Sequence, residues 1–297
     1  MNNNVSRADI REIVTHPGPA HRDEFIACSL LLGVYPTLPV YRKEPTEEDL
    51  LDPAILVVDV GGQFDLHLRN FDHHQLPRDA EPTCAITQVC KWLNIDLTTA
   101  RALWSWLEAA EILDSKGPVA LAKKYGIRGD DLHKMISTIE STVVDLFSTS
   151  SAALPGDLLH RLMIQVGKTN LDYLELVQER MALLEKNVKF YTLPAPNGGK
   201  VRVVDTTFLA GTDKPSLGVE VFLKQRTSAE TDVVVSNDDR GNGLTLFRRQ
   251  AAEGVVDFSL LEGNSEVLFA HKGGFIAKTH GKDVDWRVLV EKAALPS

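Results

Sequence analysis

The chain has 297 residues, of which 43% are hydrophobic and 25% are charged, so it can bury a core without disulfide staples. Its formal net charge of -9 argues against tight, sequence-independent binding of long duplex nucleic acid, which requires many lysine and arginine contacts to phosphate. A small phosphorylated substrate or a nucleic-acid end is not excluded, because bound cations supply positive charge locally.

Location is indicated by the cysteines and by the absence of long apolar runs. The N-terminal sequence MNNNVSRADIREIV lacks the pattern of a signal peptide, and no stretch has the roughly 18 apolar residues of a membrane span. The spacing of Cys28, Cys84 and Cys90 fits neither a zinc ribbon nor a disulfide framework. We therefore expect a cytoplasmic protein with no membrane partner, and the oligomeric state stays open.

The first third of the chain predicts alternating strands and helices. Residues 10–15 form a strand candidate, which leads into the loop His16-Pro17-Gly18-Pro19-Ala20-His21. Residues 24–32 then predict a buried helix that ends at Gly33. Residues 39–42 suggest a second strand.

A strongly apolar strand follows a short capped helix. Thr46-Glu47-Glu48-Asp49 has the form of a capping box. Residues 55–60 (ILVVDV) are β-branched and apolar, and Gly61-Gly62 ends them, which is typical of a strand buried in a parallel sheet. Further helices are predicted at 83–93, 98–113, over most of 119–167, and at 170–190.

The composition changes at residues 193–199 (LPAPNGG), which predict a linker or turn. Short strands at 201–204, 232–235 and 244–247, a hairpin turn at 237–242 and a helix at 286–294 follow. We predict an α/β fold with a mainly parallel-sheet domain at residues 1–192, a smaller α+β domain at 193–297, and an active site in the cleft between them.

Potential metal ligands follow the predicted strands of the first domain. His16 follows the first strand, His21 and Asp23 precede a helix, Asp59 ends the apolar strand, and Asp72-His73-His74 follows it. Because ligands of open α/β sheets bind outside the carboxyl ends of the strands, we expect these segments to converge.

Mixed histidine and carboxylate ligation suits zinc, manganese or iron, and these ligands are too many for one catalytic metal. Two cations that share a carboxylate would use them. Asp23, Asp59 and Asp114 would place three negative charges beside the four positive charges of two divalent cations. The small net positive charge that remains favours an anionic substrate.

The segments THPGPAHRDE, VVDVGG, FDHHQ and LDSKG resemble the DHH phosphoesterase superfamily, and most closely its melanocyte-proliferating-gene branch, which is also catalogued as metal-dependent protein hydrolases. The resemblance implies that His16, His21 and Asp59 bind one metal. It implies that Asp23, Asp59, His73 and Asp114 bind the other, with Asp59 bridging. His74 would contact the scissile phosphate, and Asp72 would orient a neighbouring histidine.

One position departs from the superfamily pattern. Most members have an aspartate where this chain has His21, and the spacing from His16 is one residue longer here. The melanocyte-proliferating-gene branch shares this histidine. The change reduces the negative charge at the first metal and weakens any transfer of substrate identity.

The resemblance extends to LFAHKGGFIAKT near the C-terminus. There His271, Lys272, Gly273 and Gly274 are similar to the superfamily's glycine-rich substrate-binding motif, and Arg248 and Arg249 are candidates for phosphate contacts. Simpler interpretations stay open for each of these residues. A glycine turn alone explains residues 271–274, and paired arginines such as Arg248 and Arg249 are often solvated. Asp114 could belong to a turn that ends a helix.

These patterns and the resemblance predict a metal-dependent phosphodiester hydrolase, a 3′–5′ exonuclease on RNA or short oligonucleotides, that uses a hydroxide bridging two metals. Manganese is the first choice of cation, and magnesium, zinc and iron are the alternatives. Pyrophosphate, polyphosphate or cyclic dinucleotides are the alternative substrates. A non-catalytic, metal-dependent nucleotide sensor is the alternative from another class.

Overall fold

The computed structural model describes residues 10–132, 137–212, 214, 216–226 and 231–296. The chain forms two compact units, Met1–Leu174 and Glu175–Ser297, which divide within helix α8 (Leu158–Asn187). Both units combine helices with a mixed sheet, so the α/β class is confirmed. Among the described residues, no helix combines the length and the apolar character that crossing a membrane requires.

The first sheet has the strand order β4-β5-β3-β1-β2-β6. Its four middle strands run parallel, and each edge strand is antiparallel to its neighbour. The strands are β1 (Glu12–Thr15), β2 (Val40–Arg42), β3 (Ile55–Val58), β4 (Phe64–Asp65), β5 (Asn70–Phe71) and β6 (Ala152–Ala153).

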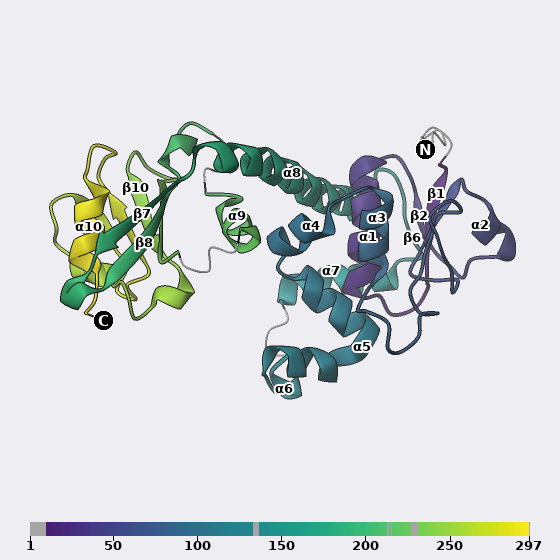
Figure 1. Cartoon of the computed structure of the whole chain (residues 1–297). Helices are drawn as coiled ribbons and strands as arrows, with labels where there is room; N and C mark the ends of the chain where they lie inside the picture. Colours follow the sequence, from purple (N-terminus) through teal and green to yellow (C-terminus); the bar gives the residue numbers. More distant parts are fainter. Residues whose placement is uncertain (1–9, 133–136, 213, 215, 227–230, 297) are drawn as a thin grey trace. The chain divides into compact units, whose positions relative to one another are not determined.

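Apolar side chains cover both faces of this sheet, as the unbroken apolar run of β3 predicts. On one face, Ile13, Leu56 and Val58 pack with helices α1 (Arg22–Val34) and α3 (Ala85–Trp92). On the other face, Val14 and Val57 form a smaller cluster, which Leu50 of α2 (Glu47–Leu51) covers. Figure 1 shows α1 and α3 on one side of the strands and α2 on the other.

The helices that follow differ in their limits from the sequence expectation. They are α4 (Leu97–Leu103), α5 (Leu107–Tyr125), α6 (Gly129–Leu132) and α7 (Thr138–Thr149). The single helix expected at 98–113 is interrupted at Trp104, and α5 has a break at Gly117, where φ is 80° and Pro118 follows. Helix α8 begins at Leu158 rather than at residue 170. Residues 133–136 of the expected 119–167 helical region lie outside the described residues.

Two glycines allow α1 and α8 to cross closely. A Cβ added at Gly167 would lie 1.8 Å from the carbonyl oxygen of Ser29, and one added at Gly33 would lie 2.9 Å from the Gly167 carbonyl carbon. Only a residue without a side chain permits this backbone approach. Since α1 begins at the candidate site, the crossing also fixes the helix that presents several candidate ligands.

The second sheet has the strand order β11-β12-β10-β9-β8-β7, with β8 and β9 parallel and the other pairs antiparallel. Its strands are β7 (Lys189–Pro194), β8 (Lys200–Asp205), β9 (Val233–Asn237), β10 (Leu244–Arg248), β11 (Val267–Ala270) and β12 (Ile276–Thr279). Short 3₁₀ segments are η3 (Pro196–Gly198), η4 (Thr207–Leu209), η5 (Gln250–Ala252) and η6 (Phe258–Leu261).

Residues 193–199, where the sequence predicts a linker or turn, form a hairpin turn inside the second sheet. There the Ala195 N–H donates to the Gly199 carbonyl over 2.9 Å, and β7 pairs with β8 on either side. The two compact units instead divide inside α8. The expected domain limits at 192 and 193 stay a prediction.

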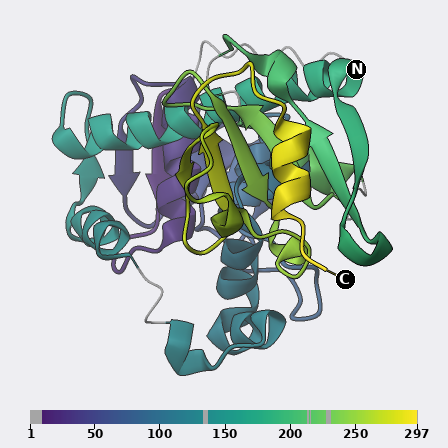
Figure 2. The same ribbon diagram turned by 90° about the vertical axis from the view of Figure 1, so that its left-hand side faces the viewer.

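Helices cover the two faces of the second sheet separately. On one face, Val203, Val235 and Leu246 pack against α10 (Trp286–Ala293) and η6. On the other face, Val204 and Val234 pack against α9 (Val219–Gln225) and Leu184 of α8. Figure 2 shows α10, in yellow, lying against the green strands.

Candidate metal centre

The carboxyl ends of three parallel strands carry the candidate ligands of the first unit. His16 follows β1, Asp59 follows β3, and Asp72-His73-His74 follows β5. Because β1, β3 and β5 are parallel, these residues leave the sheet at the same edge. The first turn of α1 adds Asp23 and Glu24, and α5 adds Asp114.

The loop between β1 and α1 is held in place by Arg42 and by the end of α7. Arg42 Nη2 donates to the Gly18 carbonyl over 2.8 Å, and its Nη1 donates to the Phe147 and Ser148 carbonyls over 3.0 and 2.7 Å. The Ala20 N–H donates to Ser148 Oγ over 3.1 Å. This buried arginine therefore fixes the loop that carries His16 and His21.

Asp59 lies between two histidines. Its Oδ1 is 3.2 Å from His73 Nε2, and its Oδ2 is 3.8 Å from His16 Nε2. The backbone of Asp59 has φ of 58°, in the left-handed region that side-chain-bearing residues other than asparagine and aspartate rarely adopt. This sharp turn directs the carboxylate between the two rings, and strain of this kind is frequent at functional sites.

His73 meets three carboxylates. Its Nε2 lies 2.5 Å from Asp114 Oδ2 and 3.8 Å from Asp23 Oδ2, in addition to its contact with Asp59. Asp23 also accepts the backbone N–H groups of Ala85 and Ile86 over 2.6 and 2.9 Å, which ties α1 to the start of α3. Ligand atoms of these four residues, those expected for the second cation, all lie within 4.8 Å of one another.

His16 and His21 are accompanied by Glu24, which the sequence predicts only as part of a helix. His16 Nε2 lies 3.2 Å from Glu24 Oε1, and His21 Nδ1 lies 3.9 Å from Glu24 Oε2. His21 is otherwise exposed, whereas Glu24 is fully buried. A sequence signal was present, because a glutamate at the third position of a helix forms a capping box with the residue before the helix.

The ring of His74, like that of His21, is mostly exposed, whereas His73 is buried. Asp72 Oδ1 lies 2.7 Å from His74 Nδ1, and Asp72 Oδ2 accepts the Gly62 N–H over 2.6 Å. A carboxylate at Nδ1 fixes the proton there and leaves Nε2 for another partner. Asp72 is therefore placed to orient His74, as the resemblance implies for this pair.

The pKa values report how closely these charges are packed. Burial raises the pKa of Asp23, and the nearby Asp59 and Asp114 carboxylates add to the effect. Burial also raises the pKa of Asp59. Burial alone would lower the pKa of His73, but the close approach of Asp114 and Asp59 raises it to about 10.

The same pattern holds for the other histidines. The Glu24 carboxylate raises the pKa of His16 to about 9, against the opposing effect of burial. The Asp72 carboxylate raises the pKa of His74. Burial would raise the pKa of Asp72, but its hydrogen bonds from His74 and Gly62 lower it to about 2. Positive charge is thus strongly favoured among these carboxylates.

A pair of cations fits the donor atoms. Within the described part of the chain, the buried atoms that make no hydrogen bond include four from this cluster: Glu24 Oε2, Asp59 Oδ1, His73 Nε2 and Asp114 Oδ2. Buried polar atoms rarely remain without partners, and an ion is one of the explanations. The donor set of imidazoles and carboxylates suits a divalent transition metal.

The cluster opens into a pocket of about 710 Å³. His16, Asp59, Asp114 and His74 line it, together with Arg22. The ligand atoms are thus accessible to a molecule of nucleotide size, while His73 stays buried behind them.

The candidate substrate-binding residues of the second unit have partners within that unit. Arg248 Nη1 donates to the Val256 carbonyl over 2.9 Å, and Arg249 pairs with Glu220 through Nε and Nη2 over 3.1 and 3.2 Å. Both arginines therefore have structural contacts, and their role toward a substrate stays a prediction.

The glycine-rich motif forms the turn between β11 and β12. His271 Nδ1 accepts the Gly273 N–H over 2.9 Å, and Lys272 is exposed. Gly274 has φ of 68°, and a Cβ there would lie 2.1 Å from Asp257 Oδ1. The need for glycine at 274 thus follows from the turn itself, and binding of a substrate by this turn stays a prediction.

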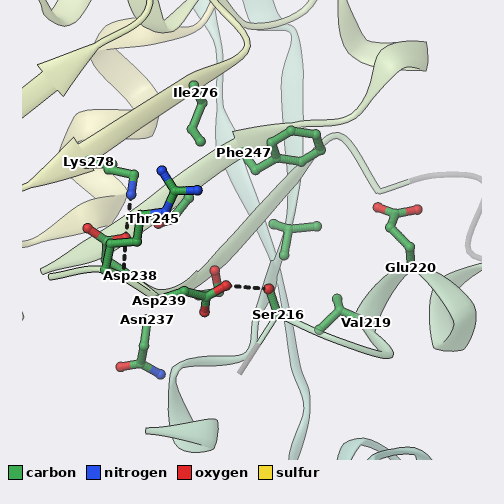
Figure 3. Close-up of a pocket in the computed structure, with 13 residues that line it drawn as sticks. Ser216, Val219, Glu220, Asn237, Asp238, Asp239, Thr245, Phe247, Ile276 and Lys278 are labelled. Carbon is green, nitrogen blue, oxygen red and sulfur yellow. Dashed lines mark hydrogen bonds and ion pairs between the residues drawn. The ribbon is translucent and has the colours of Figure 1, made fainter. Parts of the chain in front are cut away.

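A second pocket, of about 490 Å³, lies within the second unit and is lined by other residues. Phe247, Ile276 and Val219 form apolar parts of its lining (Figure 3). Its polar residues pair with one another: Lys278 contacts Asp238, and Ser216 donates to Asp239 over 2.8 Å. None of the candidate substrate-binding residues of this unit is among its described lining.

The fold and the site together define an α/β protein with a candidate two-cation centre of histidines and carboxylates. Residues 12–86 match the model of MYG1_exonuc, described as an uncharacterised protein family (UPF0160). This segment contains every candidate ligand of the centre except Asp114.

Two mammalian relatives match a similar length of chain. The MYG1 exonuclease of Bos taurus is 40% identical over 67 residues, which are 21% of this chain and 16% of that protein. The MYG1 exonuclease of Homo sapiens is 42% identical over 65 residues, which are 21% of this chain and 17% of that protein. The chain therefore aligns with about a sixth of the length of these curated relatives.

Among solved structures, the chain is similar to a pGpG-specific phosphodiesterase, PggH, from Vibrio cholerae. The match covers 92% of both chains with 11% identity and a TM-score of 0.28. That score is too low to establish a shared fold.

Proposed function

We propose that this protein is a metal-dependent phosphodiester hydrolase of the DHH superfamily, in its melanocyte-proliferating-gene branch. The local likeness to MYG1 exonucleases over residues 12–86 supports the proposal. The observation that carries it is the position of Asp59, with one carboxylate oxygen toward His73 and the other toward His16. This is the arrangement expected of a carboxylate shared by two cations.

His16, His21 and Asp59 would hold one cation, and Asp23, Asp59, His73 and Asp114 would hold the other. Bound divalent cations supply Lewis-acid stabilisation of phosphoryl oxygens and lower the pKa of water. Manganese is the first choice for this mixture of imidazole and carboxylate, and magnesium, zinc and iron are the alternatives.

His74 and Asp72 are the catalytic pair in this proposal. Asp72 accepts the Nδ1 proton of His74 and so directs Nε2 toward the pocket that His74 lines. From there a protonated His74 donates to a phosphate oxygen or to the leaving oxygen. His73 is buried, so it does not compete for this role.

We propose a 3′–5′ exonuclease on RNA or short oligonucleotides. The net charge of -9 favours short substrates or ends over long duplex, since tight binding of long duplex depends on many lysine and arginine contacts to phosphate. Arg248, Arg249 and the 271–274 turn are the proposed contacts of the second unit to the substrate. Cleavage of pyrophosphate, polyphosphate or cyclic dinucleotides, and nucleotide sensing without turnover, are the alternatives that the assay must separate.

The test is a substrate panel with chelator-stripped protein, assayed with and without manganese. We expect no activity in chelator, recovery with manganese, and release of mononucleotides from short RNA. Turnover of only pyrophosphate or a cyclic dinucleotide would replace the proposed substrate, and tight nucleotide binding without turnover would indicate a sensor. Full activity in chelator would contradict the mechanism.

A further inference from the structure

Glu24 is a fully buried carboxylate beside two candidate ligands. It lies in the first turn of α1, where its Oε1 accepts the His21 backbone N–H over 2.6 Å. Its Oε2 has no hydrogen-bond partner among the described residues and lies 3.9 Å from His21 Nδ1. Burying a carboxylate is costly unless a partner compensates its charge, so Oε2 indicates a missing partner.

The tautomer of His16 is a second observation that calls for a positive charge beside Glu24. His16 Nδ1 lies 2.9 Å from the Pro17 carbonyl oxygen, which can only accept, so Nδ1 carries the hydrogen. In a neutral ring, Nε2 then presents a lone pair to Glu24 Oε1 at 3.2 Å and to Asp59 Oδ2 at 3.8 Å. Three acceptors that face one another require a proton or a metal ion between them.

We propose that Glu24 is a direct ligand of the first cation, together with His16, His21 and Asp59. This extends the proposed function, on which it rests, by adding a carboxylate that the resemblance does not assign. Metal–ligand bonds of about 2.1 Å allow two ligand atoms to lie up to about 4.2 Å apart. Three contacts fall within that limit: Glu24 Oε1 to His16 Nε2 at 3.2 Å, Glu24 Oε2 to His21 Nδ1 at 3.9 Å, and Asp59 Oδ2 to His16 Nε2 at 3.8 Å. Ligand atoms of His16, His21 and Glu24 also all lie within 4.8 Å of one another.

The two oxygens of Glu24 have separate roles in this arrangement. Oε1 accepts the His21 N–H, closes the capping box and faces His16, while Oε2, which has no hydrogen-bond partner among the described residues, is the oxygen available to the cation. The start of α1 is thereby tied to the cation, and His21 is brought beside it although its own side chain is mostly exposed.

The added carboxylate changes the charge of the centre. With Glu24, four ligand carboxylates balance the four positive charges of two divalent cations, so no net positive charge remains for the substrate. Attraction of a phosphate then depends on side chains outside the ligand set, of which His74 and Arg22 line the pocket. The extra oxygen ligand also favours manganese over zinc at the first position.

The test is a manganese titration of chelator-stripped wild type and Glu24→Gln, followed by calorimetry and electron paramagnetic resonance. Glutamine keeps an oxygen for the His21 N–H, so the helix cap and the melting temperature of the metal-free protein should be retained. We expect two manganese ions in wild type. In Glu24→Gln we expect one ion to bind more than about tenfold more weakly, and the manganese-to-zinc affinity ratio to fall.

Glu44→Gln, at an exposed glutamate, is the matched control and should bind as wild type does. Two ions of unchanged affinity in Glu24→Gln would overturn the proposal, as would a wild type that binds no cation at this cluster. Because the readout is binding, the outcomes are separable from the proposed function. A wild type that binds two ions but hydrolyses nothing would contradict the function and leave the Glu24 assignment standing.

Discussion

At the scale of single residues, Asp59 determines whether the centre can hold two cations. Its carboxylate oxygens lie 3.8 Å from His16 Nε2 and 3.2 Å from His73 Nε2, and its left-handed backbone places it there. Asparagine tolerates the same backbone conformation and has nearly the same shape. Replacement of Asp59 by asparagine therefore changes the charge while the turn is kept.

We expect Asp59→Asn to lose both cations and to be the least active variant, since a neutral amide is a poor bridging ligand. His74→Ala should keep both cations and lower the hydrolysis rate by roughly 10²–10⁴-fold, the usual contribution of a general acid. Metal content by mass spectrometry and rates on short RNA check both expectations. Asp145→Asn, at an exposed aspartate, is the control, and retention of two cations in Asp59→Asn would disprove the bridging role.

The sequence predicts much of the cluster because its members follow strands. His16, Asp59 and His73 follow three parallel strands at one edge of the sheet. The structure places His16 Nε2 and His73 Nε2 within 3.8 Å of the Asp59 carboxylate. The sequence marks Glu24 only as a capping residue of α1, because its burial beside the two histidines depends on tertiary packing. The pairing of Arg249 with Glu220 likewise joins positions 29 residues apart.

At the scale of elements, the crossing of α1 and α8 holds α1, the helix that carries Asp23 and Glu24, in place. The two helices approach at Gly33 and Gly167, where added side chains would collide with backbone atoms. Helix α8 begins 12 residues before the helix expected at 170, because Gly167, at which the sequence predicts a helical region to end, lies inside α8 and permits its close packing against α1.

Gly167→Ala should destabilise the first unit, because its Cβ would meet the Ser29 carbonyl oxygen at 1.8 Å. Overpacking of this kind costs about 1–3 kcal/mol, which outweighs the gain of about 1 kcal/mol in helix propensity. Thermal unfolding measures the change. Gly129→Ala in α6 is the control, since a Cβ there has no neighbour within 4 Å, and an equal melting temperature for both variants would refute the crossing.

The start of α4 gives a pH-dependent prediction. Asp96 accepts the Thr98 and Thr99 N–H groups and the Thr99 hydroxyl, and these bonds lower its pKa from the usual 3.8. Its stabilisation is therefore present above pH 3.8 and is lost as the pH falls through the lowered pKa. Asp96→Ala should cost about 0.5–2 kcal/mol at pH 7.

Urea unfolding of wild type and Asp96→Ala at several pH values measures this difference. The difference in unfolding free energy between wild type and Asp96→Ala should decrease steadily as the pH falls below 3.8. A gap that widens on acidification would show that the cap does not act through its carboxylate.

At the scale of the whole molecule, the chain consists of two α/β units with separate cores. The α/β class and the longer apolar strands β1, β2, β3, β8, β9 and β10 were predictable, because apolar runs bounded by glycine and proline mark most of them, whereas the short edge strands and β7, β11 and β12 were not predicted. Residues 193–199 have a composition that suits a linker and a turn equally, and they form the turn of the hairpin between β7 and β8. The candidate metal centre lies entirely within the first unit, so its assembly can be tested without reference to the second.

The central claim is that this cluster holds two cations around Asp59. Crystals of the full chain grown with manganese, measured at the manganese absorption edge, test it most directly. We predict two anomalous peaks about 3.5–4 Å apart, one beside His16 and His21 and the other beside His73 and Asp114, with Asp59 between them. No peak at these residues, or a single peak that Asp59 does not contact, would contradict the account.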